Sequence, residues 1–435
     1  MKLGNGKKRK LRVNLFLFIP TILICLIGIV TLLSTTIGTD GVFGDTSIVQ
    51  KQISFVVIGL ILFLITSLVD ISLFKYIQIV IPIYVITILL LVALFPFGPV
   101  INNVQRWLVI GGIQIQPSEI AKVTVVITTA CIFSFKERYN QWLLFLISFL
   151  ATLPLVILIY LQPAGSMSFL TLMIWFLVAF TGLSNQLRNS IALLIVTLIT
   201  STFFLISFNG NWLYLILSGI ALIIGIFAYY YRDSWKIFVV VSFAIGLLLG
   251  AFTSITYRGI LRDYQRNRIE AFLNPKDSTE DIGFNVNQAR IAIGSGQIWG
   301  KGFGNGTQSK RDFLPEHQTD FIYASFAEEF GLVGSLFLIT LFGIVIVKSL
   351  IVTVDHSDNL FFSMILIGLT MKFLLEIFIN IGTNLGIIPA TGIPLPLVSA
   401  GGTITVMTLF SLGIVQSIIN RGGSHKSSKN IIDNY

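Results

Sequence analysis

Charged residues are scarce in this chain. Only 11% of its 435 residues are Asp, Glu, Lys or Arg, whereas soluble domains carry roughly 25%. Hydrophobic residues make up 54% of the chain, and apolar runs recur at about 20 residues, the length that crosses a hydrocarbon core of ~30 Å as a helix. The composition excludes a soluble globular fold and predicts an all-α polytopic membrane protein.

Cysteine is also scarce. The chain has two cysteines, Cys25 and Cys131, and both lie inside apolar runs. Two distant thiols provide neither a disulfide framework nor a metal site, so we interpret both as packing residues. Acidic residues are also few, 20 against 29 Lys and Arg, for a net charge of +9. Basic tails beside an anionic membrane leaflet explain this excess, so no nucleic-acid partner is expected.

Twelve apolar segments are candidate membrane spans. The first is too long for a cleaved signal peptide and follows the basic segment 1–12, so we expect a cytoplasmic N-terminal tail. Short connections on the same side, such as 136–141 and 231–236, are mostly basic, which puts the C-terminal tail 421–435 in the cytoplasm too. The predicted spans are 13–36, 53–73, 75–97, 117–136, 141–161, 167–184, 188–208, 211–230, 236–256, 322–350, 359–381 and 401–420.

We interpret 1–435 as a single transmembrane domain with two unusual connections on its outer face. The first, 257–321, precedes the tenth span and holds nine Lys or Arg and eight Asp or Glu. A structureless loop of this length is usually functional. The second, 382–400, is rich in Gly and Pro. Irregular backbone near membrane depth must be buried in protein or line a wet cavity.

Two pairs of ionisable residues stand out inside the predicted spans. Glu119 and Lys122 are three apart at the start of the fourth span, and Lys372 and Glu376 are four apart in the eleventh. Each spacing places the two side chains on one helix face as a candidate ion pair. Ionisable groups in membrane spans are costly and often functional, and the alternative is a structural pair that joins helices.

The long loop contains two distinctive patches. Residues 257–275 form a basic amphipathic pattern, typical of a helix at the membrane interface or of a phosphate-binding arginine cluster, with a solvated charged face as the alternative. Residues 291–308 are rich in glycine but lack the spacing of a Walker or dinucleotide loop, so we expect no organic cofactor. Glycine there permits tight turns and close approach to a ligand.

Carboxylates gather where the loop returns to the membrane: Glu316, Asp320, Glu328 and Glu329 fall within 316–329. A carboxylate at a wet–dry boundary can act as a general base or hold a divalent cation such as Mg²⁺ or Mn²⁺. The alternative is helix capping, because acidic groups favour helix N-termini.

Several long motifs resemble the SEDS family, whose members include the peptidoglycan glycosyltransferases RodA, FtsW and SpoVE. They occur in the family's order and extend over nearly the whole chain, and ATGIPLP (390–396) resembles the RodA type. The matching segments are RWLVIGGIQIQPSEIAKV (106–123), YQRNRIEAFLNP (264–275), NQARIAIGSGQIWGKGFGNGTQ (287–308), FLPEHQTDFIYASFAEEFGLVG (313–334) and NIGTNLGIIPATGIPLPLVSAGG (380–402).

The resemblance implies polymerisation of lipid II at the outer face of the bacterial cytoplasmic membrane, for cell-wall elongation and cell shape, with a class B penicillin-binding protein as partner. It assigns the catalytic carboxylate to Asp320, with Glu316 as a second catalytic candidate. The expected substrate-binding residues are Arg106, Trp107, Glu119, Lys122, Arg262, Arg266, Arg268, Gln288, Lys301, Gln308, Thr391 and Ser399.

The chain departs from the family pattern in places. Gln318 replaces the usual His two residues before the Asp, QPAGS (162–166) lacks the family's acidic residue, and Ala400 replaces a Tyr. The family usually has ten spans, which leaves an extra pair inside 188–256. Two other functions stay open: a lipid II flippase, and a non-catalytic scaffold for the penicillin-binding protein.

Overall fold

The computed structural model describes residues 13–38, 42–100, 105–207, 213–259, 281–310 and 316–432. The helices are α1 Leu15–Thr35, α2 Ser47–Leu68, η1 Ile71–Lys75, α3 Ile77–Phe97, α4 Pro117–Phe133, α5 Gln141–Leu161, α6 Gly165–Gly182, α7 Gln186–Ser207, α8 Leu213–Tyr231, η2 Asp233–Trp235, α9 Lys236–Gly259, α11 Asp281–Ser295, α12 Thr307–Lys310, α13 Ile322–Asp355, α14 Leu360–Asn384 and α15 Gly402–Ile432. The strands are β1 Leu108–Ile110 and β2 Ile113–Ile115, an antiparallel hairpin that pairs Leu108 with Ile115.

Helices occupy all twelve predicted spans, which confirms the all-α polytopic fold. Among the described residues, eleven helices are long and apolar enough to cross a membrane. The remaining one, α4, has 17 residues, and most of its side chains are buried in protein. A helix that is enclosed by its neighbours can carry polar groups that lipid would exclude.

The chain divides into two compact units. Unit 1 comprises residues 1–182 and 279–435, and unit 2 comprises residues 183–278. Within unit 2, α7 packs against α8 and α9 around a small apolar cluster. Unit 2 contains the predicted extra pair of spans, and much of the surface of α8 is apolar and exposed, as a membrane span requires.

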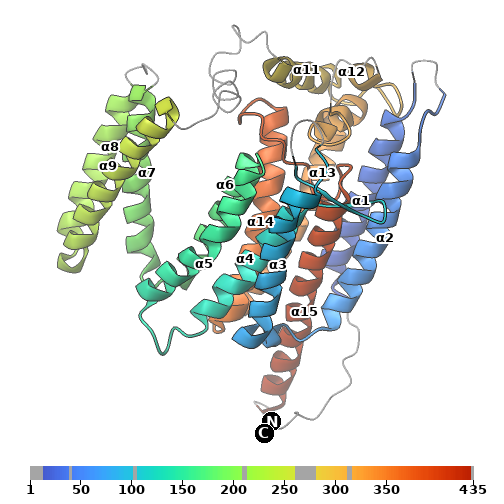
Figure 1. Cartoon of the computed structure of the whole chain (residues 1–435). Helices are drawn as coiled ribbons and strands as arrows, with labels where there is room; N and C mark the ends of the chain where they lie inside the picture. Colours follow the sequence, from blue (N-terminus) through green and yellow to red (C-terminus); the bar gives the residue numbers. More distant parts are fainter. Residues whose placement is uncertain are drawn as a thin grey trace. The chain divides into compact units, whose positions relative to one another are not determined.

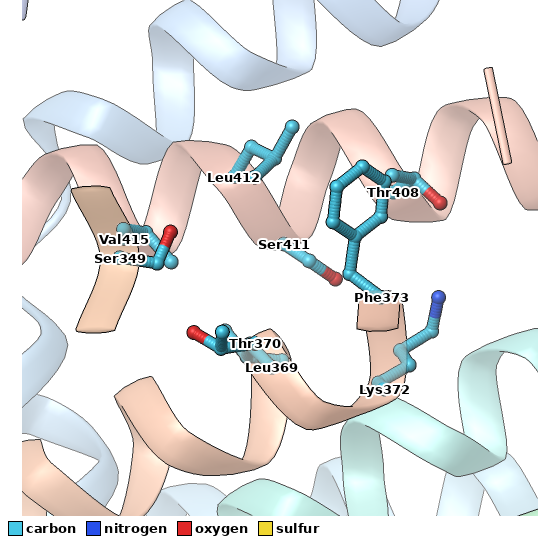
Figure 2. A pocket seen from close by; sticks show the side chains of 9 residues that line it. All are labelled: Ser349, Leu369, Thr370, Lys372, Phe373, Thr408, Ser411, Leu412 and Val415. Carbon is cyan, nitrogen blue, oxygen red and sulfur yellow. The ribbon is translucent and has the colours of Figure 1, made fainter. Parts of the chain in front are cut away.

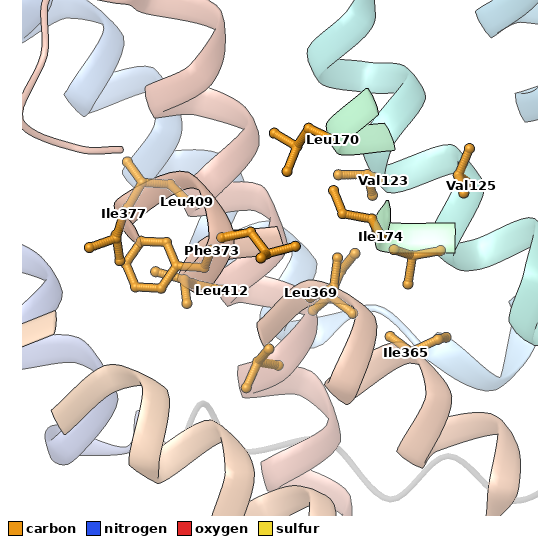
Figure 3. Close-up of a cluster of buried hydrophobic side chains, with 14 of the residues drawn as sticks. Val123, Val125, Leu170, Ile174, Ile365, Leu369, Phe373, Ile377, Leu409 and Leu412 are labelled. Atoms are coloured by element: carbon orange, nitrogen blue, oxygen red, sulfur yellow. The ribbon is translucent and has the colours of Figure 1, made fainter. Parts of the chain in front are cut away.

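Helix α14 lies at the centre of unit 1 and packs against α4, α6, α13 and α15 (Figure 1). Phe373 of α14 lies near Leu412 of α15 in the apolar core, to which Val123 of α4 also belongs (Figure 3). The sequence forms this helix because apolar residues surround its axis and Asn359 caps its start by accepting a hydrogen bond from the Phe362 amide. Polar groups on α14 must therefore find partners inside the protein.

The long connection 257–321 contains a helix that the sequence did not predict. Its described part contains α11, which packs against α13 (Figure 1). Ala289 and Ala292 of α11 are fully buried against Phe321 and Ala324, with Val286 beside them. The apolar spacing is that of one helix face, so α11 forms by covering the start of α13.

Other details also differ from the prediction, and the second span, predicted as 53–73, is α2 at Ser47–Leu68 followed by η1. Helix α15 continues to Ile432, beyond the predicted end at 420, because no proline follows to stop it. Helix α13 is interrupted at Gly331, which has φ 64° and ψ −163°. Nine residues, Ile322–Phe330, thus form a separate short helical segment before the long one.

Candidate functional site

The turn formed by residues 316–321, here the carboxylate turn, leads directly into α13. Glu316 begins it with a positive φ of 55°. The Glu316 carbonyl accepts hydrogen bonds from the amides of Thr319 (3.1 Å) and Phe321 (3.2 Å). The Thr319 hydroxyl donates to the exposed Glu316 carboxylate over 2.7 Å. The turn is closed on itself, with the Glu316 side chain folded over it.

The segment 385–401, between α14 and α15, holds two carbonyls of this turn. The Ala400 amide donates to the Gln318 carbonyl over 2.8 Å. The Ser399 hydroxyl donates to the Thr319 carbonyl over 2.5 Å and accepts from the Leu395 amide over 2.8 Å. Ser399 is fully buried. The structure thus places this predicted substrate-binding residue beneath the turn, with its hydroxyl engaged by backbone groups.

Asp320 is half-buried, and its backbone carbonyl accepts hydrogen bonds from two side chains of α14. The Nδ2 atoms of Asn380 and Asn384 lie 2.9 and 3.0 Å from it. The carboxylate faces Gly392, because Oδ2 lies 3.5 Å from the position that a Cβ at residue 392 would take. Gly392 has φ 71°, a conformation that favours glycine. The Asp320 carboxylate is therefore presented to a position that carries no side chain.

Sequence reasoning missed Asn380 and Asn384. The available signal was their spacing, because two amides four residues apart lie on one face of a largely apolar helix. Side-chain amides in membrane spans usually find hydrogen-bond partners inside the bundle. The partner, Asp320, lies 60 and 64 residues away along the chain, so only the folded structure reveals it.

Glu328 lies in the first helical segment of α13, Ile322–Phe330, and is enclosed by residues 291–308, here the glycine-rich segment. Its Oε1 accepts from the Lys301 ammonium over 2.6 Å and from the Thr307 hydroxyl over 2.7 Å. The amides of Thr307 and Gln308 donate to the same carboxylate over 2.9 and 3.2 Å. The side chain of Glu328 is fully buried. Lys301 and Gln308 were both predicted to bind substrate. In the structure, the Lys301 ammonium and the Gln308 amide instead anchor this segment to Glu328.

Glu329 makes a second anchor on the same segment. Its carboxylate accepts from the Ser34 hydroxyl of α1, which itself accepts from the Gly304 amide over 2.9 Å. Backbone contacts reinforce the attachment: a Cβ at Gly300 would collide with the Glu329 carbonyl, and one at Gly331 would collide with the Gly300 amide. The glycines permit close backbone packing here, which is the tight approach predicted from the sequence, with α13 in place of a ligand.

The remaining predicted substrate-binding residues are dispersed. Arg106 donates to the Pro163 carbonyl in the QPAGS segment, and half-buried Trp107 follows it, directly before β1. Gln288 is half-buried on α11, and Thr391 is half-buried beside Gly392. The predicted arginine cluster lies outside the described residues: Arg262, Arg266 and Arg268.

The two predicted ion pairs form a single network, here the buried quartet, of Glu119, Lys122, Lys372 and Glu376. The Lys122 ammonium lies 2.7 Å from Glu119 Oε1 and 2.5 Å from Glu376 Oε1. The Lys372 ammonium lies 3.0 Å from Glu376 Oε2. All four side chains are at most 1% exposed. The quartet joins α4 to α14, and its enclosure leaves the predicted substrate binders Glu119 and Lys122 without a surface for a ligand.

A small cavity borders the quartet between α13, α14 and α15 (Figure 2). It offers about 10 Å³ to the centre of a water molecule, roughly what one water needs. Lys372 contributes to its wall, as do the buried hydroxyls of Thr370 and Thr408. Neither hydroxyl has a hydrogen-bond partner among the described residues.

Among the residues that the structure describes, no cluster of three or more His, Cys, Asp or Glu side chains could hold a metal ion. Asp320 and Glu316 are two carboxylates on one turn, and Mg²⁺ is usually held by one or two carboxylates together with waters and substrate phosphates. Cys25 and Cys131 are free and buried, as their packing role requires.

Comparison with known proteins places the chain in a family. The model of the FtsW/RodA/SpoVE cell cycle proteins matches residues 14–218 and 211–422. The peptidoglycan glycosyltransferase MrdB of Escherichia coli K12 is 31% identical over 410 residues, which cover 92% of each chain. A probable peptidoglycan glycosyltransferase FtsW of Bacillus subtilis is also 31% identical, over 92% of this chain and 89% of its own.

Solved structures share the fold. The rod shape determining protein RodA of Thermus thermophilus superposes with a TM-score of 0.57 at 22% identity, over 94% of this chain and 97% of its own. A chain from a peptidoglycan synthase complex described as coordinating polymerization and crosslinking gives a TM-score of 0.63 at 23% identity, over 95% and 98% of the two chains. The family match and the identity to MrdB agree with the motifs quoted above, so this chain belongs to the SEDS family of FtsW, RodA and SpoVE proteins.

Proposed function

We propose that this protein is a peptidoglycan glycosyltransferase that polymerises lipid II. Family membership supports the reaction class, because curated relatives with matching length carry this activity in their names. The observation that carries the proposal for this chain is the carboxylate turn, where a half-buried Asp320 faces a glycine at the start of α13. A carboxylate held in this way can take a proton from a substrate hydroxyl.

The reaction joins two lipid-linked disaccharides. The 4-hydroxyl oxygen of the acceptor sugar attacks the anomeric carbon of the donor, and the bond from that carbon to the pyrophosphate oxygen breaks. Asp320 accepts the hydroxyl proton, and undecaprenyl pyrophosphate leaves with the electron pair. Glu316 lies on the same turn and is the second catalytic candidate. A base must approach the hydroxyl to about 3 Å for this transfer.

The departing pyrophosphate carries negative charge that cations must stabilise. We assign this role to Arg262, Arg266 and Arg268, because guanidinium groups bind phosphate in a bidentate manner. Arg106 and Trp107 precede the hairpin of β1 and β2, and we assign them, with Gln288 and Thr391, to contacts with the lipid-linked sugars. A bound Mg²⁺ or Mn²⁺ would supply further positive charge for the departing pyrophosphate, and activity with and without a chelator tests that role.

For the cellular role we propose cell-wall elongation, supported by the RodA-type segment ATGIPLP (390–396). The basic segment 1–12 and the basic short connections support cytoplasmic termini, which would put the carboxylate turn at the outer face, where lipid II is polymerised. A class B penicillin-binding protein is the proposed partner, and the related synthase complex that combines polymerization with crosslinking supports it.

Purified protein in detergent, supplied with lipid II and Mg²⁺, tests the function. We expect glycan strands that a muramidase degrades, together with release of undecaprenyl pyrophosphate.

The buried quartet favours one competing function, a lipid II transporter, because charged groups inside spans often mark transport pathways. Movement of lipid II across proteoliposomes without any glycan polymer would contradict the proposed reaction and favour transport.

A further inference from the structure

Asn384 bridges two backbone groups that a continuous helix would bond to each other. Its Nδ2 donates to the Asp320 carbonyl over 3.0 Å, and its Oδ1 accepts from the Ala324 amide over 3.1 Å. In an α-helix the amide of residue 324 would donate to the carbonyl of residue 320. The Ala324 amide donates to Asn384 and also to the Phe321 carbonyl over 3.0 Å, while the asparagines bind the Asp320 carbonyl, so α13 begins at Ile322 and Asp320 stays outside it.

Asn380 connects the same carbonyl to the opposite wall of the site. One Nδ2–H group donates to the Asp320 carbonyl and the other donates to the Ile393 carbonyl, each over 2.9 Å. Ile393 follows Gly392, the residue that the Asp320 carboxylate faces. A single amide thereby fixes the spacing between Asp320 and the chain across from it.

The burial of both amides shows how much depends on these contacts. Asn380 is 1% exposed and Asn384 is 0% exposed. A buried amide costs free energy unless its hydrogen bonds are made. The Asn384 Nδ2 also donates to the Asn380 carbonyl over 2.9 Å, which links the two asparagines along α14.

We propose that Asn380 and Asn384 are positioning residues that hold Asp320 outside α13 and aim its carboxylate at the reacting hydroxyl. The inference rests on the proposed glycosyltransferase reaction. Without Asn384, the Ala324 amide can donate to the Asp320 carbonyl, and this extension of α13 to Asp320 would rotate the carboxylate away from Gly392. Misplacement of a reacting group by about 1 Å can lower a rate by about 100-fold.

The test compares Asn384→Leu and Asn380→Leu with Thr383→Val. Leucine approximates the shape of asparagine and suits a membrane helix, but it makes no hydrogen bond. Thr383 lies between the two asparagines and is buried, and its hydroxyl bonds to the Pro389 carbonyl over 3.3 Å. It is the matched control because it has no contact with the Asp320 carbonyl. We expect kcat for lipid II polymerisation to fall at least 10-fold in each leucine variant, with KM within about twofold of wild type. The control should keep both values.

A second measurement works whether or not the chain polymerises lipid II. Asp320→Cys is made alone and with each leucine variant or the control, and the rate of thiol labelling by a water-soluble maleimide is followed. We expect the leucine variants to change this rate at least fivefold and the control to leave it unchanged.

If labelling changes while the wild type makes no polymer, the positioning holds and the proposed reaction fails. If labelling is the same in all backgrounds, or if only KM changes, the positioning role is wrong. Should Asn384→Leu not fold, Asn384→Ser removes the same bridge with a smaller polar side chain.

Discussion

The carboxylate turn and the buried quartet contain the same kind of group in opposite settings. Both involve side chains of α14. In the quartet, Glu119 and Glu376 are 0% exposed and pair with two lysines. Asp320 is half-buried, with its backbone rather than its carboxylate bound by the asparagines of α14. The contrast lies in enclosure: the quartet joins α4 to α14 inside the protein, whereas the turn leaves Asp320 half-buried, as the proposed proton acceptor requires.

Glu328 extends this contrast along α13. It lies only eight residues after Asp320 in the sequence, yet its carboxylate is fully buried and accepts hydrogen bonds from Lys301 and Thr307. It belongs with the quartet as a structural group. If the comparison is right, changes in the structural carboxylates lower stability, and changes around Asp320 lower the rate of reaction.

The largest stability effect is expected from Lys122→Met. The substitution leaves Glu119 and Glu376 without the ammonium that lies within 2.7 Å of both. Breaking a buried ion pair from one side costs about 3–5 kcal/mol. Thermal unfolding in detergent measures the loss, with the exposed Lys51→Met on α2 as control. An unfolding midpoint equal to that of wild type would show that the quartet contributes no net stability.

A smaller loss is expected from Glu328→Gln. The amide keeps the shape but loses the charge that binds Lys301 over 2.6 Å. Hydrogen bonds to charged groups contribute about 1.5–3 kcal/mol. Limited proteolysis of the glycine-rich segment should speed up, while the unfolding midpoint falls less than in Lys122→Met. Cleavage at the wild-type rate would remove Glu328 from the anchor.

Ser399→Ala separates a positioning role from substrate binding. Its hydroxyl bonds to Thr319 and Leu395 backbone groups, so removal should cost about 1–2 kcal/mol and loosen the carboxylate turn. We expect kcat to fall with KM nearly constant in a lipid II titration. A raised KM at constant kcat would instead support the substrate-binding role predicted from the sequence.

The smallest effect, with opposite sign, is expected from Thr408→Val. The Thr408 hydroxyl lines the cavity beside Lys372 and has no hydrogen-bond partner among the described residues (Figure 2). Valine keeps the shape and removes a buried polar group, so stability should rise by less than about 1 kcal/mol. A lower unfolding midpoint would mean that a water in the cavity binds this hydroxyl.

Hydropathy predicted the twelve helices because a bilayer forces each span to be apolar along its length. It did not predict α11, whose apolar face, with Ala289 and Ala292, becomes informative only once Phe321 lies against it. The glycines of 291–308 were correctly interpreted as sites of close approach, but the approaching group is α13.

The site was predictable in part. Family motifs locate Asp320, and the spacing of Glu119 with Lys122 indicates an ion pair. That this pair merges with Lys372 and Glu376 depends on how α4 meets α14, which no local pattern encodes. The roles of Asn380 and Asn384 likewise depend on contacts more than fifty residues away along the chain.

The central claim is that the Asp320 carboxylate accepts the proton of the attacking hydroxyl. Lipid II polymerisation by purified Asp320→Asn, measured beside wild type at equal folded concentration, tests it most directly. We predict a rate at least about 100-fold lower with an unchanged unfolding midpoint, because the amide keeps the shape but cannot act as a base. Glycan synthesis at the wild-type rate by the Asn variant would contradict this account.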